Sequence, residues 1–318
     1  MSRRVLVAGG SGMAGRALVA ALASRGGNPR ATHHAQADGL PEGAEWVRAD
    51  LRSRADCRRA LAGCEAAIMA AAVTGGSAAS QAAPWNQVTD NLVMGAEFLH
   101  ACHEEGVGRV VMIGSATCYP PGEESLREDG LDWNLDPFPA HFGIGWVSRS
   151  LEKLARFWHD KTGMEVVSVR AANIFGPYAK FDPATSNFLP ALIRKAVERL
   201  DPFEVWGSPN VVRDVISSAD FAADCLALLD VPVPCGVFNI GSGRGITVEE
   251  AVGWCLRHAG HAPSRVAYGN PAAPATQARV LDRAKLEELI GKQPRQGVEQ
   301  GIRETVAWYQ QHHATWKR

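Results

Sequence analysis

Short apolar runs alternate with amphipathic segments through the first half of the chain. The runs are mostly continuous, as is typical of strands buried on both faces of a parallel sheet. In the segments between them apolar residues recur every three to four positions, which predicts helices that cover such a sheet. The expected strands are residues 5–8, 28–34, 66–72, 109–114 and 166–170, and the expected helices are 13–25, 88–104 and 145–161.

This alternation predicts an α/β fold with a doubly wound parallel sheet of the Rossmann type, because right-handed crossovers place helices on both faces. After Asn173 proline, glycine and aromatic residues become frequent and the expected elements become shorter. We therefore expect a Rossmann domain over residues 1–172 and a smaller C-terminal lobe over 173–318, interleaved with the last strands of the sheet. The elements expected there are an extended segment at 211–216 and helices at 188–200, 247–258, 281–289 and 298–311, with Thr247 and Glu250 as a capping box.

Composition fits a globular protein. Of the 318 residues 46% are apolar and 21% are charged, which excludes a disordered or collagen-like chain. The net charge of −1 argues against electrostatic binding of nucleic acid. Because no apolar run approaches the roughly 18 residues of a membrane span, and the N-terminus lacks the pattern of a signal peptide, we expect a cytoplasmic protein with no membrane partner.

The seven cysteines are odd in number and include no C-x-x-C pair. In a chain of this size we expect them to be reduced and mostly buried, as small apolar side chains. Cysteine and histidine spacings typical of zinc ligands do not occur in the sequence. No metal site is therefore expected.

A glycine-rich turn joins the first strand to the first helix. Residues 9–15 read Gly-Gly-Ser-Gly-Met-Ala-Gly, which fits G-x-G-x-x-G. In this place the pattern indicates a dinucleotide site, because glycines let the backbone approach a pyrophosphate and the helix N-terminus offers free N–H groups. The residues assigned to the cofactor loop are Gly9, Ser11, Gly12, Met13 and Gly15.

The end of the second strand bears on the choice between NAD and NADP. Sites selective for NAD place a carboxylate about 20 residues after the glycine loop. This sequence has Arg30, His33 and His34 there and no carboxylate before Asp38. Since such side chains tolerate or attract a 2′-phosphate, NADP is expected as the cofactor, with NAD as the second choice.

Further motifs follow the glycine loop in a fixed order along nearly the whole chain. They are Ala49–Leu51, Ala70–Ala72, Asp90–Leu92, Ser115–Tyr119, Arg170–Pro177 and Phe238–Gly243. Together they resemble the extended short-chain dehydrogenase/reductase family of NAD(P)-dependent nucleotide-sugar epimerases and dehydratases. Residues 70–76, 181–195 and 205–213 look most like those of GDP-fucose synthases and their relatives.

The resemblance implies that the first domain binds NAD(P) and that the C-terminal lobe binds a nucleotide sugar. It implies these cofactor contacts: His33 at the 2′-phosphate, Asp50 and Leu51 at the adenine, Ala70, Ala71 and Ala72 along the diphosphate and ribose, and Ser148 at the position of the family's lysine. It implies these substrate contacts: Asn173 and Arg213 at the diphosphate, Trp206 at the base, and Thr74 and Asn187 beside the sugar. Asn91 would be the buried polar residue of the long helix.

The sequence departs from the family at the groups that transfer a proton. The family uses a tyrosine and a lysine, Tyr-x-x-x-Lys, on one helix, with a nearby serine or threonine that orients the same oxygen. Counting back from Asn173 places Ile144 and Ser148 at the tyrosine and lysine positions, and a register two residues earlier would place Phe142 and Trp146 there. Ser115 is in place. The cysteine and histidine that GDP-fucose synthases use for epimerisation appear here as Thr117 and Asn187, which do not titrate near neutral pH.

Four residues are considered as replacements for the missing tyrosine and lysine. His141, just ahead of the helix, has a pKa suited to proton transfer. Tyr178 follows Gly-Pro and could reach the site, whereas Tyr119 ends the serine motif and is expected to be structural. Lys153 should face away, being rotated by about 140° from Ser148. The candidate catalytic residues are therefore Ser115, Thr117 and His141.

Three functions remain open at this point. The first is an NADP(H)-dependent oxidoreductase on a nucleotide-linked sugar, in which a non-tyrosine group or water carries the proton. The second is a degenerate relative that binds dinucleotide or nucleotide sugar without turnover, and the third is a non-redox lyase or isomerase. The family's relatives are often dimers formed through two long helices, so a homodimer through residues 88–104 and 145–161 is expected, with Trp146, Leu151 and Phe157 exposed.

Overall fold

Seven parallel strands form the central sheet of the computed structural model, which describes residues 3–35, 39–75, 84–122, 125–269 and 278–316. Their order is β11-β7-β5-β4-β1-β2-β3, so the direction of winding reverses between β1 and β4. All neighbouring pairs are parallel, which confirms the predicted doubly wound α/β fold. The strands are β1 (Val5–Ala8), β2 (Arg30–His33), β3 (Glu45–Arg48), β4 (Ala66–Met69), β5 (Arg109–Ser115), β7 (Glu165–Ala171) and β11 (Cys235–Ile240).

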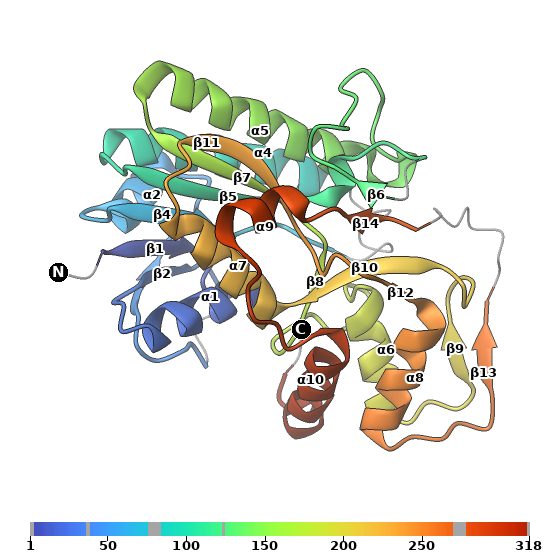
Figure 1. The fold of residues 1–318 in the computed structure, drawn as a ribbon. Coiled ribbons are helices and arrows are strands. Elements are labelled where there is room, and N and C mark those ends of the chain that lie inside the picture. Colours follow the sequence, from blue (N-terminus) through green and yellow to red (C-terminus); the bar gives the residue numbers. More distant parts are fainter. Residues whose placement is uncertain (1–2, 36–38, 76–83, 123–124, 270–277, 317–318) are drawn as a thin grey trace.

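Helices cover both faces of this sheet (Figure 1). On one face α2 (Arg54–Leu61), α4 (Pro84–Glu104) and α5 (Phe142–Thr162) share a core that includes Phe98 and Leu99. On the other face α1 (Met13–Ser24), α7 (Ser218–Asp230) and α9 (Ala284–Ile290) bury Leu18, Phe221 and Leu286. The predicted helices 13–25, 88–104 and 145–161 are therefore confirmed, with α4 and α5 beginning a few residues earlier.

Most of the chain after residue 172 surrounds a core of its own, at the lower right of Figure 1. Three helices pack there: α6 (Phe188–Val197), α8 (Val248–Ala259) and α10 (Val298–His312). The capping box of Thr247 and Glu250 begins α8 as predicted. The smaller strands are β8 (Asn173–Phe175), β9 (Phe203–Val205), β10 (Val212–Ser217), β12 (Gly245–Thr247) and β13 (Val266–Tyr268), while β6 (Ser125–Leu126) pairs with β14 (Val280–Leu281).

Several elements differ from the sequence-based expectation. Apart from bounds that shift by one to four residues, two elements change: the strand expected at 66–72 ends at Met69, and the helix expected at 281–289 begins at Ala284, because residues 280–281 pair as β14. Trp146 and Leu151 are not exposed: Trp146 Nε1 donates to Asp136, and Leu151 packs against Gly95 of α4. Of the three side chains expected at a dimer surface, Phe157 is exposed.

The cysteine prediction is confirmed, since all seven are free thiols and only Cys235 is not fully buried. None of the helices in the described part of the chain combines the length and the apolar character that crossing a membrane requires.

Candidate active site

The glycine loop joins β1 to α1 at the point where the strand order reverses. Gly9 has a left-handed φ of 82°, and a Cβ there would lie 2.5 Å from the backbone of Ala71. A Cβ on Gly15 would collide with the Gly9 carbonyl, so both positions require glycine for the fold itself. At Gly12 φ is −78°, and the nearest atom to an added Cβ is the Gly9 carbonyl at 3.4 Å. Protein packing therefore does not explain Gly12, whereas a ligand that lies against the loop does.

The first turn of α1 offers hydrogen-bond donors to that ligand. The helix begins at Met13, and its N-cap Gly12 has no side chain to accept from the first-turn N–H groups. A phosphate binds readily at such a helix end, because the N–H groups and the helix dipole both favour negative charge. The loop is braced from behind, where Gly9 N donates to Thr32 Oγ1 at 2.8 Å. The residues present thus fit the pyrophosphate of a dinucleotide.

The end of β2 corrects one part of the cofactor prediction. Arg30 begins β2, and its Nη1 donates to the Ala60 and Ala62 carbonyls while Nη2 pairs with Glu45. Its guanidinium therefore lies at the opposite end of the strand and does not contribute to a 2′-phosphate site. His33 ends β2 beside Arg48 of β3, and its Nδ1 is buried without a hydrogen-bond partner among the described residues.

Asp50, expected at the adenine, is held by a neighbouring arginine. The Nε and Nη2 atoms of Arg52 donate to its two carboxylate oxygens at 3.0 and 2.9 Å. These hydrogen bonds lower the pKa of Asp50 to about 2, so the group is ionised throughout the physiological range. Leu51 beside it is buried in the core between the sheet and α2.

The segment after β4 passes directly beside the glycine loop. A Cβ on Gly9 would lie 2.5 Å from the backbone of Ala71; Ala70 and Ala71 are half-buried and Ala72 is exposed. Asn91 of α4 is buried, as expected, and fixes the segment by accepting from Val73 N at 2.8 Å and donating to Val73 O at 3.0 Å.

Thr74 continues this segment towards the C-terminal lobe. The Nζ atom of Lys180 donates to its carbonyl at 2.6 Å and to its hydroxyl at 3.1 Å. Lys180 belongs to the loop between β8 and α6, so the contact joins the two halves of the chain. The sequence analysis did not predict Lys180 as a site residue. Gly76, the last residue of the stretch 70–76 considered there, lies outside the described residues.

Ser115 and Thr117 form a turn at the end of β5. Ser115 Oγ accepts from Thr117 N at 3.2 Å, and the hydroxyl of Thr117 is buried with no partner in the described part of the chain. Burying a hydroxyl without a hydrogen-bond partner costs free energy, so a substrate oxygen or a bound water would supply the missing hydrogen bond of Thr117. Gly145 of α5 abuts this turn, because a Cβ there would lie 2.7 Å from the Thr117 carbonyl.

Position 148 also faces the end of β5. A Cβ on Gly114 would lie 3.9 Å from Ser148 Oγ, and Ser148 is buried. Ile144 precedes it by about one helical turn on the same helix. Ser148, which the sequence analysis assigns to the family's lysine position, therefore lies beside Gly114 at the end of β5, and neither Ile144 nor Ser148 carries a group that exchanges protons near neutral pH.

The other candidates for proton transfer are engaged elsewhere. The Tyr178 ring lies over the guanidinium of Arg16, 4.4 Å from Cζ to the ring centroid. Lys153 Nζ lies 4.0 Å from the centroid of Trp133, in agreement with the expectation that it faces away. Tyr119 is fully buried and donates to Asn239 Oδ1 at 2.9 Å, as expected of a structural residue.

His141 is the titratable candidate that remains. It ends the short helix η2 (Pro139–His141), directly before α5. Desolvation lowers the pKa of His141 below its usual value, and the charges of Arg279 and Arg213 lower it further. Its imidazole is thus neutral at neutral pH and able to accept a proton.

Two arginines, Arg213 and Arg279, lie next to each other near His141. Arg213 of β10 pairs in a β-bridge with Arg279, and burial lowers the pKa of both guanidinium groups. Arg279 donates to the Ala116 and Tyr119 carbonyls at 3.3 and 3.0 Å, so it touches the serine turn. It forms no ion pair with any carboxylate among the described residues. Two cations so close together favour an anionic ligand, and a guanidinium matches two phosphate oxygens.

The sequence analysis predicted Arg213 and missed Arg279. A buried carboxylate, Asp214, brings them together: its Oδ2 accepts from Leu281 N at 3.0 Å and its Oδ1 from Ser242 N at 2.8 Å. These bonds fix the strand that follows Arg279 against β10. No local motif around Arg279 indicated this, because the contact depends on long-range pairing.

The remaining predicted substrate residues are accessible. Asn173, at the start of β8, is exposed and donates to the Asp214 carbonyl at 3.3 Å. Asn187 is exposed at the N-cap of α6 without a capping hydrogen bond. Trp206 is 81% exposed in the turn after β9. Among the described residues, no three His, Cys, Asp or Glu side chains are grouped so as to hold a metal ion.

Comparisons with known proteins identify relatives of this chain in sequence and in fold. The chain is 27% identical to GDP-L-fucose synthase 1 of Arabidopsis thaliana over 97% of this chain and 93% of that protein. It is 28% identical to a GDP-L-fucose synthase of Sinorhizobium fredii over 94% of this chain and 93% of that protein. The structure of Thermus thermophilus UDP-glucose 4-epimerase in complex with NAD superposes with a TM-score of 0.80 at 26% identity, covering 96% of this chain and 98% of that one.

The family model described as the NAD dependent epimerase/dehydratase family matches residues 5–241, from β1 through the end of β11. This span includes the glycine loop, the Ser115 turn and Arg213. The chain belongs to the NAD dependent epimerase/dehydratase family.

Proposed function

We propose that this protein is an NADP(H)-dependent oxidoreductase that acts on a nucleotide-linked sugar. The observation that carries the proposal is the pair Arg213 and Arg279 beside the Ser115–Thr117 turn, because it places a diphosphate-binding charge next to groups that can orient a sugar oxygen. The similarity to GDP-L-fucose synthases supports a nucleotide sugar as the substrate.

In this proposal the two ligands occupy adjoining regions. The glycine loop and the segment from Ala70 to Ala72 hold the dinucleotide, with His33 and Arg48 near a 2′-phosphate. Arg213, Arg279 and Asn173 hold the substrate diphosphate, Trp206 lies against the base, and Thr74 and Asn187 flank the sugar. This division assigns residues 1–172 to the cofactor and 173–318 to the substrate. We also propose that the protein is cytoplasmic.

In the proposed reaction fewer side chains are available to transfer a proton than in a site that contains the family's tyrosine and lysine. Bound NADP(H) would supply or accept a hydride. Ser115 would orient the reacting oxygen of the sugar. The proton of that oxygen would move to or from His141, directly or through a water held by Thr117. A positioned general acid or base contributes about 10²–10⁴ in rate, so the absence of a tyrosine predicts slow turnover rather than none.

A second candidate is a protein that binds the same ligands without transferring hydride, or that carries out a non-redox lyase or isomerase reaction. The observation that favours it is that Ile144 and Ser148 stand where the sequence analysis expects the family's tyrosine and lysine, with Ser148 beside Gly114 at the end of β5.

A deuteride-transfer assay separates the two. The purified protein would receive NADPH deuterated at the transferable position together with a panel of nucleotide 4-keto sugars, and the products would be analysed by mass spectrometry. Deuterium in a product supports the oxidoreductase and identifies its substrate. If NADPH and a sugar both bind but no label is transferred, the oxidoreductase proposal fails and the binding or non-redox alternatives remain.

A further inference from the structure

Arg16 is a buried cation directly behind the glycine loop. It follows Gly15 in the first turn of α1 and is 2% exposed. Its Nε donates to the Ser11 carbonyl at 3.0 Å, and Nη1 donates to the Gly39 carbonyl. A buried charge is costly unless its surroundings compensate for it. These carbonyls supply part of that compensation and tie the guanidinium to the loop.

Aromatic rings from two distant parts of the chain supply another part. Cζ of Arg16 lies 4.4 Å from the ring centroid of Tyr178 and 5.8 Å from that of Trp316, within the range of a cation–π contact. Trp316 lies at the end of the four residues that follow α10, 313–316, which we call the C-terminal strap. Its Nε1 donates to the Ala179 carbonyl at 2.8 Å.

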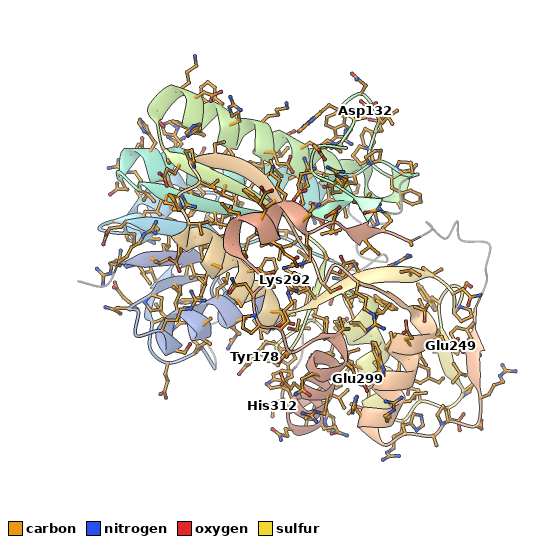
Figure 2. The ribbon with its side chains drawn as sticks, in the orientation of Figure 1. Asp132, Tyr178, Glu249, Lys292, Glu299 and His312 are labelled. Atoms are coloured by element: carbon orange, nitrogen blue, oxygen red, sulfur yellow. The ribbon has the colours of Figure 1, made fainter. Side chains whose placement is uncertain are left out.

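The rings also hold one another. Tyr178 packs against Trp308 at 4.7 Å and Trp316 at 5.4 Å between centroids, and Trp308 stacks on His312 at 4.6 Å. Figure 2 shows Tyr178 and His312 near one another beside α10. Tyr178 has a φ of 66°, a backbone conformation that aromatic residues rarely adopt and that persists only where the surroundings enforce it. This packing fixes the ring over Arg16.

We infer that Arg16 is a positioning residue for the dinucleotide and that the C-terminal strap, through Trp316 and Tyr178, holds it in place. The chain of contacts runs from Trp316 to Tyr178, then to the guanidinium, then to the Ser11 carbonyl. Ser11 and Gly12 are the part of the loop that would face the pyrophosphate. Loss of the strap therefore lets the loop move, and dinucleotide affinity falls. The inference rests on the proposed function, since it needs a dinucleotide at this loop.

The test is a titration of NADPH into the full-length protein and its variants, with the melting temperature measured alongside. Trp316→Ala is expected to raise the Kd for NADPH about five- to thirtyfold, the equilibrium equivalent of a largely desolvated cation–π contact. Trp316→Phe, which keeps a ring, is expected to restore most of the affinity. Arg16→Lys keeps the charge but not the planar guanidinium, so its Kd for NADPH is expected to lie between those of Trp316→Phe and Trp316→Ala. Arg25→Ala, at the other end of α1, serves as the control and leaves the Kd unchanged.

Two results would overturn the inference, and they are distinguishable. If the native protein binds NADPH and Trp316→Ala binds it equally well at a temperature where both are folded, the strap has no role in cofactor binding, while the proposed function stands. If the native protein binds neither NADPH nor NADH, the proposed function and this inference fail together. A lower melting temperature with an unchanged Kd identifies a purely structural contact and counts against the inference.

Discussion

Gly12 and Gly15 lie three residues apart in one loop, yet different forces require them. At Gly15 a side chain would collide with the Gly9 carbonyl, so the fold excludes it. At Gly12 the backbone angles suit any residue, and the nearest atom to an added Cβ is the Gly9 carbonyl oxygen at 3.4 Å. The sequence motif treats the two glycines alike, and only the three-dimensional packing shows that the fold excludes a side chain at Gly15 but not at Gly12.

Alanine substitutions test this distinction. Gly12→Ala is expected to keep the native melting temperature within a few degrees and to lose most of its NADPH affinity, because the methyl group occupies the space for the pyrophosphate. Gly15→Ala is expected to lower stability by about 1–3 kcal/mol, as overpacking does. Calorimetry and NADPH titration of both variants measure the two effects. Native affinity in folded Gly12→Ala would mean that the dinucleotide does not lie against this residue.

Burial and nearby charge together set the protonation of His141. Desolvation lowers its pKa, and the charges of Arg279 and Arg213 lower it further, so the folded protein binds the proton more weakly than the unfolded chain does. The stability that this group contributes is complete above its ordinary pKa of about 6.5 and is lost as the pH falls through the lowered value. A bound diphosphate would offset the two positive charges and raise the pKa again.

NMR titration of the His141 ring protons measures this directly. We expect a pKa below about 6.5 in the free protein. The pKa should rise in Arg279→Met, which removes one cation, and should also rise when inorganic pyrophosphate is added to the native protein. His141→Gln identifies the resonance. An unchanged pKa in Arg279→Met would show that the arginine charge does not act on His141, and an unchanged pKa with pyrophosphate would place the anion elsewhere.

At the scale of elements, helix α5 lies against the Ser115 turn but carries isoleucine and serine at the two positions where the sequence analysis expects tyrosine and lysine. It abuts the Ser115 turn through Gly145, and Ser148 still faces the end of β5. Positions 144 and 148 lie about one turn apart on α5. A tyrosine and a lysine introduced there are therefore expected to point to the same site.

The double variant Ile144→Tyr with Ser148→Lys tests whether the rest of the site is intact. We expect hydride transfer to rise about 10²–10⁴-fold over the native protein, the contribution of a positioned general acid. Each single variant should gain much less, because the lysine acts by tuning and holding the tyrosine. Deuteride transfer from labelled NADPH measures the rate. A folded double variant that binds both ligands without any gain would argue against Ile144 and Ser148 as the equivalent positions.

The elements that the sequence predicted are those marked by a continuous apolar run or by a recognisable helix cap. Strands β1 and β5 and the capping box of α8 follow directly from local residue patterns. Helix α2 was missed because four of its eight residues are charged and it buries only Cys57, Ala60 and Leu61. Helix α7 was missed because apolar residues occur on all its sides, which hides the helical period.

At the scale of the whole molecule, the candidate site is assembled from distant segments. The glycine loop could be predicted because it is local, and Arg213 because it belongs to a motif. Arg279 could not be predicted, since Asp214 brings it to Arg213 through bonds that span more than sixty residues. Arg30 was misplaced because the sequence does not reveal at which end of a strand a long side chain binds.

The outer face of α4 and α5 suggests how copies of the chain associate. The two helices pack against each other on the side away from α10 (Figure 1), and they expose Trp85, Val93 and Phe157. Large exposed apolar side chains on neighbouring helices are typical of an interface. We therefore predict a homodimer through this face, with the C-terminal elements remote from it.

Light scattering after size-exclusion chromatography tests the dimer. The native protein is expected to elute with twice the mass of one chain at micromolar concentration, and Phe157→Glu is expected to elute as a monomer, because the interface would bury an unpaired charge. Leu200→Glu introduces the same charge at an exposed leucine after α6 and should leave the dimer intact. A native protein of single-chain mass, or a Phe157→Glu variant that remains dimeric, would show that this face is not the interface. Because α5 also borders the Ser115 turn, loss of the dimer should be accompanied by a lower rate of deuteride transfer.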